Sequence, residues 1–307
     1  MATRDEDHEL LTKASSLAGS GNHKRALKYY DKMLTRDPEH PIALYNKGVS
    51  LGALDRHEES LRCWEILVQI QTKEETGLTD VLIEDVLYNK GVALQLTGRL
   101  DDAIATWRQA LGLNPRMTMA WFKTGKCLSD MGHVDEALEC YENALSTDPD
   151  HAMSWYNKGN LLDKVGRKAE ALECFEKVVT LDPKDGDGWH RIGYTLNDMG
   201  RFVEAITCFE RSLEIDPRNP QTCNDIGFSL AKQGRFEEAL RQLDMAVKLD
   251  PENAEIWKNR GVVLRESQRF REALDSFERA VKLDPSHEVA RRNLEMMKAL
   301  TRHGFGR

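Results

Sequence analysis

Six prolines follow one another at intervals of 34 residues: Pro115, Pro149, Pro183, Pro217, Pro251 and Pro285. A fixed period of about 20 to 50 residues is the signature of a solenoid. Each unit of such a chain is too small to bury its own apolar face and must stack on its neighbours. We therefore expect one elongated body of repeats, although 307 residues would suffice for about two conventional domains.

The prolines define a 34-residue frame in which proline occupies position 32. Frames then begin at residues 84, 118, 152, 186, 220 and 254. Pro38 closes an earlier frame over residues 7–40, and a frame without proline covers residues 41–74. The chain thus holds eight units.

Several positions of this frame recur with the spacing of a helix face. Position 8 is glycine in seven units, position 11 is leucine in all eight, position 20 is alanine in seven, and position 24 is a large side chain. Positions 4, 8 and 11 share one helix face, and positions 20, 24 and 27 share a face of a second helix. Glycine inside a helix costs about 1 kcal/mol relative to alanine. The glycines at position 8 therefore predict a close approach to the alanines at position 20, within a helix hairpin.

Position 15 lies between the two expected helices and is glycine in six units, with Asp55 and Gln268 in the other two. Glycine there suits the left-handed conformation that ends a helix and turns the chain. Acidic pairs, Asp101-Asp102 and Glu237-Glu238 among them, follow at the start of the second helix, where they complement its dipole.

The pattern resembles the tetratricopeptide repeat, whose signature is W-x2-L-G-x2-Y, A-x3-F and P. The fifth unit of this chain matches the signature at Trp155, Gly159, Ala171, Phe175 and Pro183. The resemblance covers residues 7–287, and the repeated "YNKG" blocks look most like tandem arrays of prokaryotic and archaeal repeat proteins. It implies an all-α, right-handed superhelical solenoid of eight helix-turn-helix units.

Residues 75–83 depart from the period, because they are nine extra residues between the second unit and the third. Thr79 or Asp80 could cap a backward extension of the next helix. Two interpretations stay open: a longer loop or helix end, or a kink that separates units 1 and 2 (7–74) from units 3 to 8 (84–287).

Residues 288–300 are predicted to be helical, but Arg291 and Glu295 occupy positions 4 and 8, which pack inward in a complete hairpin. A solenoid needs a polar-backed element at its open end. We therefore expect a C-terminal capping helix, followed by a tail at 301–307.

The composition limits the classes of partner and compartment. Charged residues make up 31% of the chain, both signs are mixed along it, and the net charge is −8, whereas nucleic-acid binding needs a basic stripe. The first residues, MATRDEDHELL, carry charge where a signal peptide needs an apolar stretch. No run of 18 apolar residues is present, so the sequence predicts a cytoplasmic protein without membrane insertion.

Four cysteines share position 23 of the frame: Cys63, Cys140, Cys174 and Cys208. Equivalent points of stacked hairpins lie roughly 10–20 Å apart, whereas a disulfide needs Cα atoms within about 7 Å. These cysteines are expected to be reduced packing residues. No CxxC or clustered Cys/His spacing indicates a metal, and no cofactor is expected.

The tetratricopeptide resemblance implies that the first helices line a concave groove, with positions 2, 5, 6, 9, 12 and 13 facing it. Position 5 is aromatic in four successive units, and position 6 is asparagine in four of the eight. Aromatic rings supply contact area at low entropic cost, and asparagine can bond the backbone of an extended peptide. The predicted peptide-binding residues are Tyr45, Asn46, Tyr88, Asn89, Phe122, Lys123, Lys126, Tyr156, Asn157, Asn160, Arg191 and Tyr194. The alternative is that the rings pack on the neighbouring hairpin and the asparagines are only the repeat consensus.

Two other kinds of site find little support. The carboxylate clamp of this repeat family would match only Asn157 and Arg191, and Asp187 places an anion where that clamp needs a cation. No P-loop, GxGxxG, HExxH or GxSxG motif occurs, and the histidines fall at scattered positions of the frame. We therefore expect no enzymatic activity.

The sequence thus predicts an adaptor or scaffold that holds an extended or helical peptide of a protein partner in its groove. Two alternatives remain: a self-assembling structural protein that uses its ends or its cysteine-bearing face, and a regulatory subunit of a separate enzyme. The sequence identifies neither the partner nor the oligomeric state.

Overall fold

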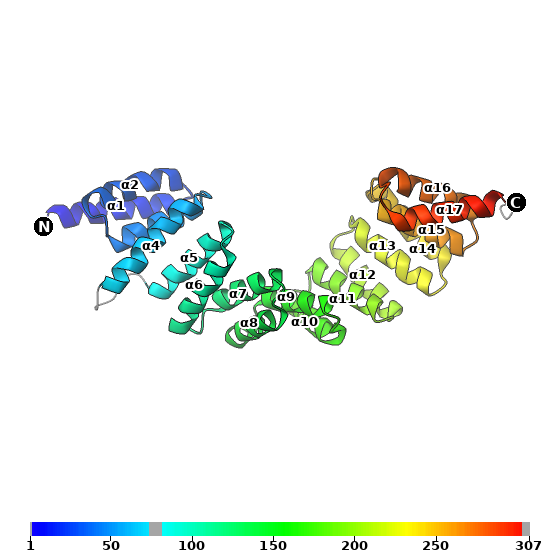
Figure 1. Ribbon diagram of the computed structural model, residues 1–307, viewed down its shortest axis with the longest axis horizontal. Coiled ribbons are helices and arrows are strands. Elements are labelled where there is room, and N and C mark those ends of the chain that lie inside the picture. The colour runs from blue at the N-terminus through cyan, green and yellow to red at the C-terminus, as the bar shows by residue number, and fades with distance from the viewer. Residues whose placement is uncertain (1, 74–81, 303–307) are drawn as a thin grey trace. The chain divides into compact units, whose positions relative to one another are not determined.

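The computed structural model describes residues 2–73 and 82–302, which form seventeen helices. Sixteen of them pair in chain order into eight hairpins (Figure 1). The first helices of the hairpins are α1 (Ala2–Gly19), α3 (Pro41–Gly52), α5 (Ile83–Leu96), α7 (Thr118–Asp130), α9 (Ala152–Lys164), α11 (Gly186–Asp198), α13 (Pro220–Lys232) and α15 (Ala254–Glu266). The second helices are α2 (His23–Arg36), α4 (His57–Lys73), α6 (Leu100–Leu113), α8 (Val134–Thr147), α10 (Lys168–Leu181), α12 (Phe202–Ile215), α14 (Phe236–Leu249) and α16 (Phe270–Leu283).

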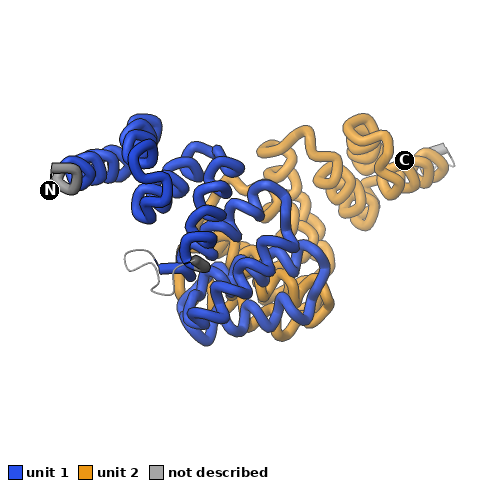
Figure 2. Tube along the Cα trace, turned by 60° about the vertical axis from the view of Figure 1, so that its left-hand side comes forward, with its two compact units in different colours: residues 1–154 blue, residues 155–307 orange. Residues whose placement is uncertain are grey.

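The chain divides into two compact units, an N-terminal unit of residues 1–154 and a C-terminal unit of residues 155–307 (Figure 2). Within each unit, a helix packs mainly against the helices just before and after it in the chain. Weaker contacts join first helices of successive hairpins, such as α3 with α5 and α11 with α13. This nearest-neighbour pattern confirms the predicted all-α solenoid, in which each hairpin stabilises only those beside it.

The turns between paired helices confirm the prediction for position 15. All six glycines there have positive φ, from 74° at Gly234 to 85° at Gly166. Asp55 (φ 58°) and Gln268 (φ 61°) adopt the same left-handed conformation without being glycine. In each case this residue ends the first helix, so the backbone reverses direction whether or not glycine is present.

The second helices begin with a repeated ion pair between positions 16 and 19. Arg235 donates from Nε and a terminal nitrogen to the two carboxylate oxygens of Glu238, at 2.8 and 2.7 Å. Five further pairs have the same spacing: Arg56–Glu59, Arg99–Asp102, Arg167–Glu170, Arg201–Glu204 and Arg269–Glu272. The acidic residues therefore bind an arginine in addition to lying at the positive end of the helix dipole.

The glycines at position 8 make room above all for the large side chain at position 24. The predicted approach of position 20 is also present: Ser60 Oγ donates to the Gly48 carbonyl at 2.8 Å, and a Cβ on Gly227 would lie 3.2 Å from the Ala239 carbonyl oxygen. A Cβ placed on Gly193 would lie 2.6 Å from a ring carbon of Phe209, and one on Gly48 would lie 2.7 Å from Trp64. Both rings are almost completely buried. The hairpin needs glycine because the large side chain of its second helix lies directly against the backbone of its first.

The helix α17 (Glu288–Arg302) packs on α16 and buries one face through Ala290, Leu294 and Met297. Arg291 and Glu295 are exposed, as expected where no partner helix covers positions 4 and 8. The helix thus closes the stack of hairpins, as the sequence predicts.

Two further predictions concern the insertion and the cysteines. The insertion at 75–83 lies almost wholly outside the described residues, as do Thr79 and Asp80, and α5 begins at Ile83. All six cysteines are unbonded. Burial raises the pKa of three of these thiols to about 11, those of Cys63, Cys140 and Cys208. They are therefore inert packing groups.

No helix in the described residues is long and apolar enough to cross a membrane.

Candidate functional site

We use "first-helix face" for the surface formed by positions 2, 5, 6, 9, 12 and 13 of the first helices, within each unit separately. The position-5 rings lie at its base and contact the ring at position 24 of the same hairpin. The ring centroids of Tyr45 and Trp64 are 5.4 Å apart in an edge-on arrangement, and those of Tyr156 and Phe175 are 6.0 Å apart. Burial raises the pKa of the Tyr45 phenol. These rings therefore belong largely to the hairpin core.

Phe122 departs furthest from its predicted role. Its side chain is only 5% exposed, and its ring contacts those of Tyr141 and His151. Tyr88 is half-buried, and burial raises the pKa of its phenol. Phe122 offers almost no surface area to a partner. For this residue the alternative interpretation from the sequence holds, in which the position-5 ring packs within the hairpins.

Position 5 of one hairpin also contacts position 6 of the next. Asn89 Nδ2 lies 3.5 Å from the Tyr45 hydroxyl, and Arg191 Nε donates to the Tyr156 hydroxyl at 3.4 Å. Further along the chain, Asn259 Nδ2 donates to Asn224 Oδ1 at 2.8 Å. The aromatic and asparagine stripe is therefore a ladder of contacts that joins successive hairpins.

In the C-terminal unit, one of these contacts between positions 5 and 6 is part of a buried polar cluster. Asp225 is 8% exposed, and one of its carboxylate oxygens lies 2.9 Å from His190 Nε2. The other oxygen accepts hydrogen bonds from Gln221 and Asn224, each at 3.0 Å. A buried carboxylate with this many donors is stably held, so the cluster fixes the packing of α11 against α13.

The remaining residues predicted to bind a peptide differ in how far their side chains are exposed. Asn46, Lys123 and Asn157 are half-buried at position 6. Lys126 is 44% exposed at its side chain and lies 3.8 Å from Asp130. Asn160 Oδ1 is enclosed, and no donor to it is present in the described part of the chain.

Among the described residues, three of the six exposed large apolar side chains of this face lie at position 9, which the sequence placed second to position 5; the others are Met119 and Met153 at position 2 and Leu96 at position 13. Val49, Tyr194 and Phe228 are 43%, 42% and 40% exposed. Phe228 contacts the Phe202 ring edge-on at 6.4 Å, and Lys232 Nζ lies 5.2 Å from its centroid. Position 9 therefore provides apolar contact area in both units.

A cavity of about 210 Å³ opens on this face in the N-terminal unit, between α3, α4 and α5. Its walls include Val49, Val92 and Leu96, and Asn89 lies at its edge. Gly52 also lines it and was missed by the sequence reasoning. The frame did hold the signal, because Gly52 is the only glycine at position 12 among the eight units.

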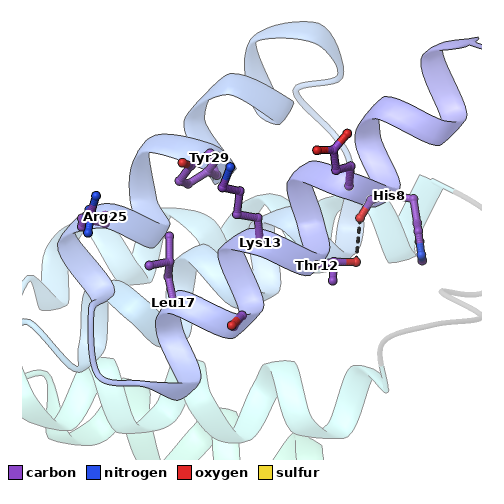
Figure 3. A pocket seen from close by; sticks show the side chains of 8 residues that line it. His8, Thr12, Lys13, Leu17, Arg25 and Tyr29 are labelled. Carbon is purple, nitrogen blue, oxygen red and sulfur yellow. Dashed lines mark hydrogen bonds between the residues drawn. The ribbon is translucent and has the colours of Figure 1, made fainter.

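A larger cavity of about 670 Å³ lies on the first hairpin, between α1 and α2 (Figure 3). Polar and charged residues line it beside Leu17, and much of the surface they present is the apolar part of their side chains; Lys13 Nζ lies 5.6 Å from the Tyr29 ring centroid. Glu9, Lys13 and Ser16 occupy positions 3, 7 and 10 there. In α7 these positions are Ala120, Thr124 and Cys127, all buried. The cavity contains none of the predicted residues.

In the described residues, no group of histidine, cysteine, aspartate and glutamate has the arrangement of a metal site.

Comparisons with known proteins agree with the tetratricopeptide assignment. A tetratricopeptide-repeat model matches residues 11–64. Among solved structures, the chain is 24% identical to the tetratricopeptide protein YrrB, described as having an unusual peptide-binding site. That match covers 62% of this chain and 97% of YrrB, with a TM-score of 0.53.

Two further solved structures show the same fold. The Pseudomonas aeruginosa protein pilF is 20% identical over 70% of this chain and 96% of its own, with a TM-score of 0.57. The Cut9–Hcn1 assembly of the APC/C is 16% identical over 94% of this chain and 55% of the matched chain, with a TM-score of 0.55. A search of the curated proteins found no match.

A second family model covers most of the chain, residues 53–296, and describes the C-terminal domain of cilia and flagella-associated protein 70. The match spans six complete hairpins and the start of α17, the same elements that carry the repeat. The chain therefore belongs to the family of the cilia and flagella-associated protein 70 C-terminal domain, which is built from tetratricopeptide repeats.

Proposed function

We propose that this protein is an adaptor whose first-helix face binds an extended segment of a partner protein. The observation that supports this most directly is the exposure of apolar side chains at position 9: Tyr194 and Phe228 on successive hairpins of the C-terminal unit, and Val49 at the same position in the N-terminal unit. Exposed apolar groups on the same face of neighbouring hairpins indicate an interaction surface. The binding residues proposed from the sequence contribute through Lys126, Asn160 and Tyr194, while Phe122 supports them from inside the hairpin.

The polar groups of the face suit a peptide backbone. The asparagines at position 6 are half-buried beside the apolar side chains, and the amide nitrogens of Asn89 and Asn259 are hydrogen-bonded within the protein. An extended segment carries a free N–H at each residue, which an asparagine carbonyl oxygen can accept. Recognition would then combine apolar contact at position 9 with backbone hydrogen bonds to position 6.

The comparisons support binding of proteins in general terms. Tetratricopeptide repeats mediate protein–protein interactions, and the YrrB structure is described as having an unusual peptide-binding site. The family model describes a protein of cilia and flagella, so we place the partner among the components of those organelles and the adaptor in the adjoining cytoplasm.

The test uses a randomised peptide library displayed on phage and selected on the full chain. Selected peptides are then titrated by calorimetry into a triple variant, Val49→Ser, Tyr194→Ser and Phe228→Ser. Truncation of a hot-spot residue, a class enriched in tyrosine, costs about 2 kcal/mol or more, so we expect the affinity to fall by more than roughly tenfold. The three side chains are well exposed, so the fold should persist, which circular dichroism checks.

The matched control is Val203→Ser, which removes a valine that is 69% exposed on the second helix α12. It should leave peptide affinity unchanged. Equal affinity for the wild type and the triple variant would rule out the first-helix face as the binding surface.

A further inference from the structure

We infer that the cavity at Gly52 is a specificity pocket that takes one aliphatic side chain of the bound segment. This inference rests on the function proposed above and adds which partner residue is recognised, and where. The cavity lies in the N-terminal unit on the first-helix face, and Val49 lines its wall. It therefore includes the position-9 valines of two successive hairpins, Val49 and Val92.

The size of the cavity indicates a side chain. Pockets that hold whole small molecules measure about 300 to 1,000 Å³. At about 210 Å³ this one is smaller, and its walls come from three helices, α3, α4 and α5. A single side chain, inserted from a segment that crosses the face, is the guest that matches these dimensions.

The lining indicates that the side chain is aliphatic. Val49, Val92 and Leu96 form apolar walls, with Val49 and Leu96 43% and 56% exposed, and the buried Trp64 ring borders the cavity. Its polar lining is His57, Ser60 and Asn89; none of the described lining residues is lysine, arginine, aspartate or glutamate, and His57 Nε2 already lies 3.8 Å from the Asp55 carboxylate. A charged guest would lose its hydration without gaining an ion pair, whereas burial of an aliphatic group is favourable.

Asn89 supplies the polar contact beside the pocket. Its amide nitrogen donates to the Asp85 carbonyl at 2.8 Å and lies 3.5 Å from the Tyr45 hydroxyl. The nitrogen is thus engaged within the protein, and Asn89 offers a guest its carbonyl oxygen, an acceptor for a backbone N–H. The site therefore selects an aliphatic residue presented on an extended backbone.

Gly52 is the residue that keeps the pocket open. It is the last residue of α3, and a Cβ added to it would meet only the Ser60 hydroxyl, at 3.9 Å. The next hairpin carries Gln95 at this position. Gly52→Gln thus places in this hairpin the side chain that its neighbour already holds, fills the cavity and creates no backbone clash.

The test uses the full chain with methyl-labelled valine and leucine, titrated with N-acetyl-leucine N-methylamide and followed by NMR. This probe carries one aliphatic side chain and two backbone N–H groups. We expect it to shift the methyl signals of Val49, Val92 and Leu96. The glycine and lysine analogues of the probe, which share its backbone, should bind roughly tenfold more weakly or not at all.

Gly52→Gln should abolish the shifts that the leucine probe causes while leaving the melting temperature unchanged or higher. The control is Gly112→Gln, the same substitution at an exposed helical glycine of α6 that has open space around it. It should leave the shifts intact. Equal shifts with the glycine analogue, or leucine shifts that survive Gly52→Gln, would overturn the inference.

The two proposals can fail separately. If the library peptides bind at position 9 but the leucine probe does not enter the cavity, the pocket is wrong and the adaptor function stands. If the probe binds and the triple variant still holds every selected peptide, the pocket stands and the proposed peptide surface is wrong.

Discussion

The contact between Gly193 and Phe209 gives the sharpest test of how a hairpin is built. In Gly193→Ala the new Cβ would lie 2.6, 2.7 and 3.0 Å from three carbons of the Phe209 ring. Ordinary van der Waals contact begins near 3.4 Å, so the ring would have to move by most of an ångström. Phe209 is completely buried and packs against His190 at 5.3 Å between centroids, which leaves it no free direction.

Two opposing effects set the magnitude. Overpacking of this kind costs about 1–3 kcal/mol, whereas replacing glycine by alanine inside a helix gains up to about 1 kcal/mol. The 2.6 Å approach places the overpacking cost in the upper part of its range, about 2–3 kcal/mol, so we expect a net loss of about 1–2 kcal/mol in the free energy of unfolding. The sign should reverse in a Phe209→Ala background, where the ring is gone: there Gly193→Ala keeps only the helix gain and fills part of the void.

The assay is urea denaturation followed by circular dichroism for the wild type, both single variants and the double variant. Phe209→Ala alone should cost about 3–5 kcal/mol. Gly112→Ala serves as the control, because Gly112 is a helical glycine with open space around it and should only gain stability. A Gly193→Ala variant as stable as the wild type, or one whose cost persists without the ring, would refute this account of position 8.

Two further predictions concern charge and thiols. The hydrogen bond from Arg201 lowers the pKa of the Glu204 carboxyl in the folded protein. The pair therefore stabilises the fold fully above the pKa of an unfolded glutamate, about 4.3. This stabilisation is lost as the pH falls through the lower pKa of the folded state. The difference in melting temperature between the wild type and Arg201→Gln should therefore stay constant from pH 7 to 5 and shrink below that; a difference that changes only at higher pH would contradict the assignment. Thiols with a pKa of about 11 carry little thiolate near neutral pH, and this applies to Cys63, Cys140 and Cys208. At pH 8 an aromatic disulfide reagent should therefore label these cysteines slowly in the native protein and quickly in the urea-unfolded protein. Rapid labelling of the native chain would contradict their burial.

Much of the fold could be predicted because it depends on local rules repeated many times. The left-handed turn at position 15 follows from chain geometry alone, which explains why Asp55 and Gln268 adopt it as the glycines do. The closing role of α17 followed from polar residues at two positions, Arg291 and Glu295, that a partner helix would otherwise cover. Such signals depend on neighbours in the chain or on the period, and both are visible in a sequence.

The orientation of side chains around a helix was harder to predict. Positions 5 and 9 both lie on the first-helix face in a helical projection, and the aromatic residues at position 5 drew attention to it. Only the packed hairpin shows that the Phe122 ring at position 5 contacts the Tyr141 ring at position 24, while Tyr194 at position 9 remains exposed.

The sequence alone determined the number of hairpins, their turns and the helix that closes them, because each depends on a period or a local backbone preference. The tertiary structure decided what those hairpins present to a partner. Whether Gly193 faces an alanine or a ring, whether Asn89 bonds within the protein, and whether Gly52 opens a cavity all depend on distances between separate helices. Side-chain volume and direction set those distances, and a one-dimensional pattern carries neither.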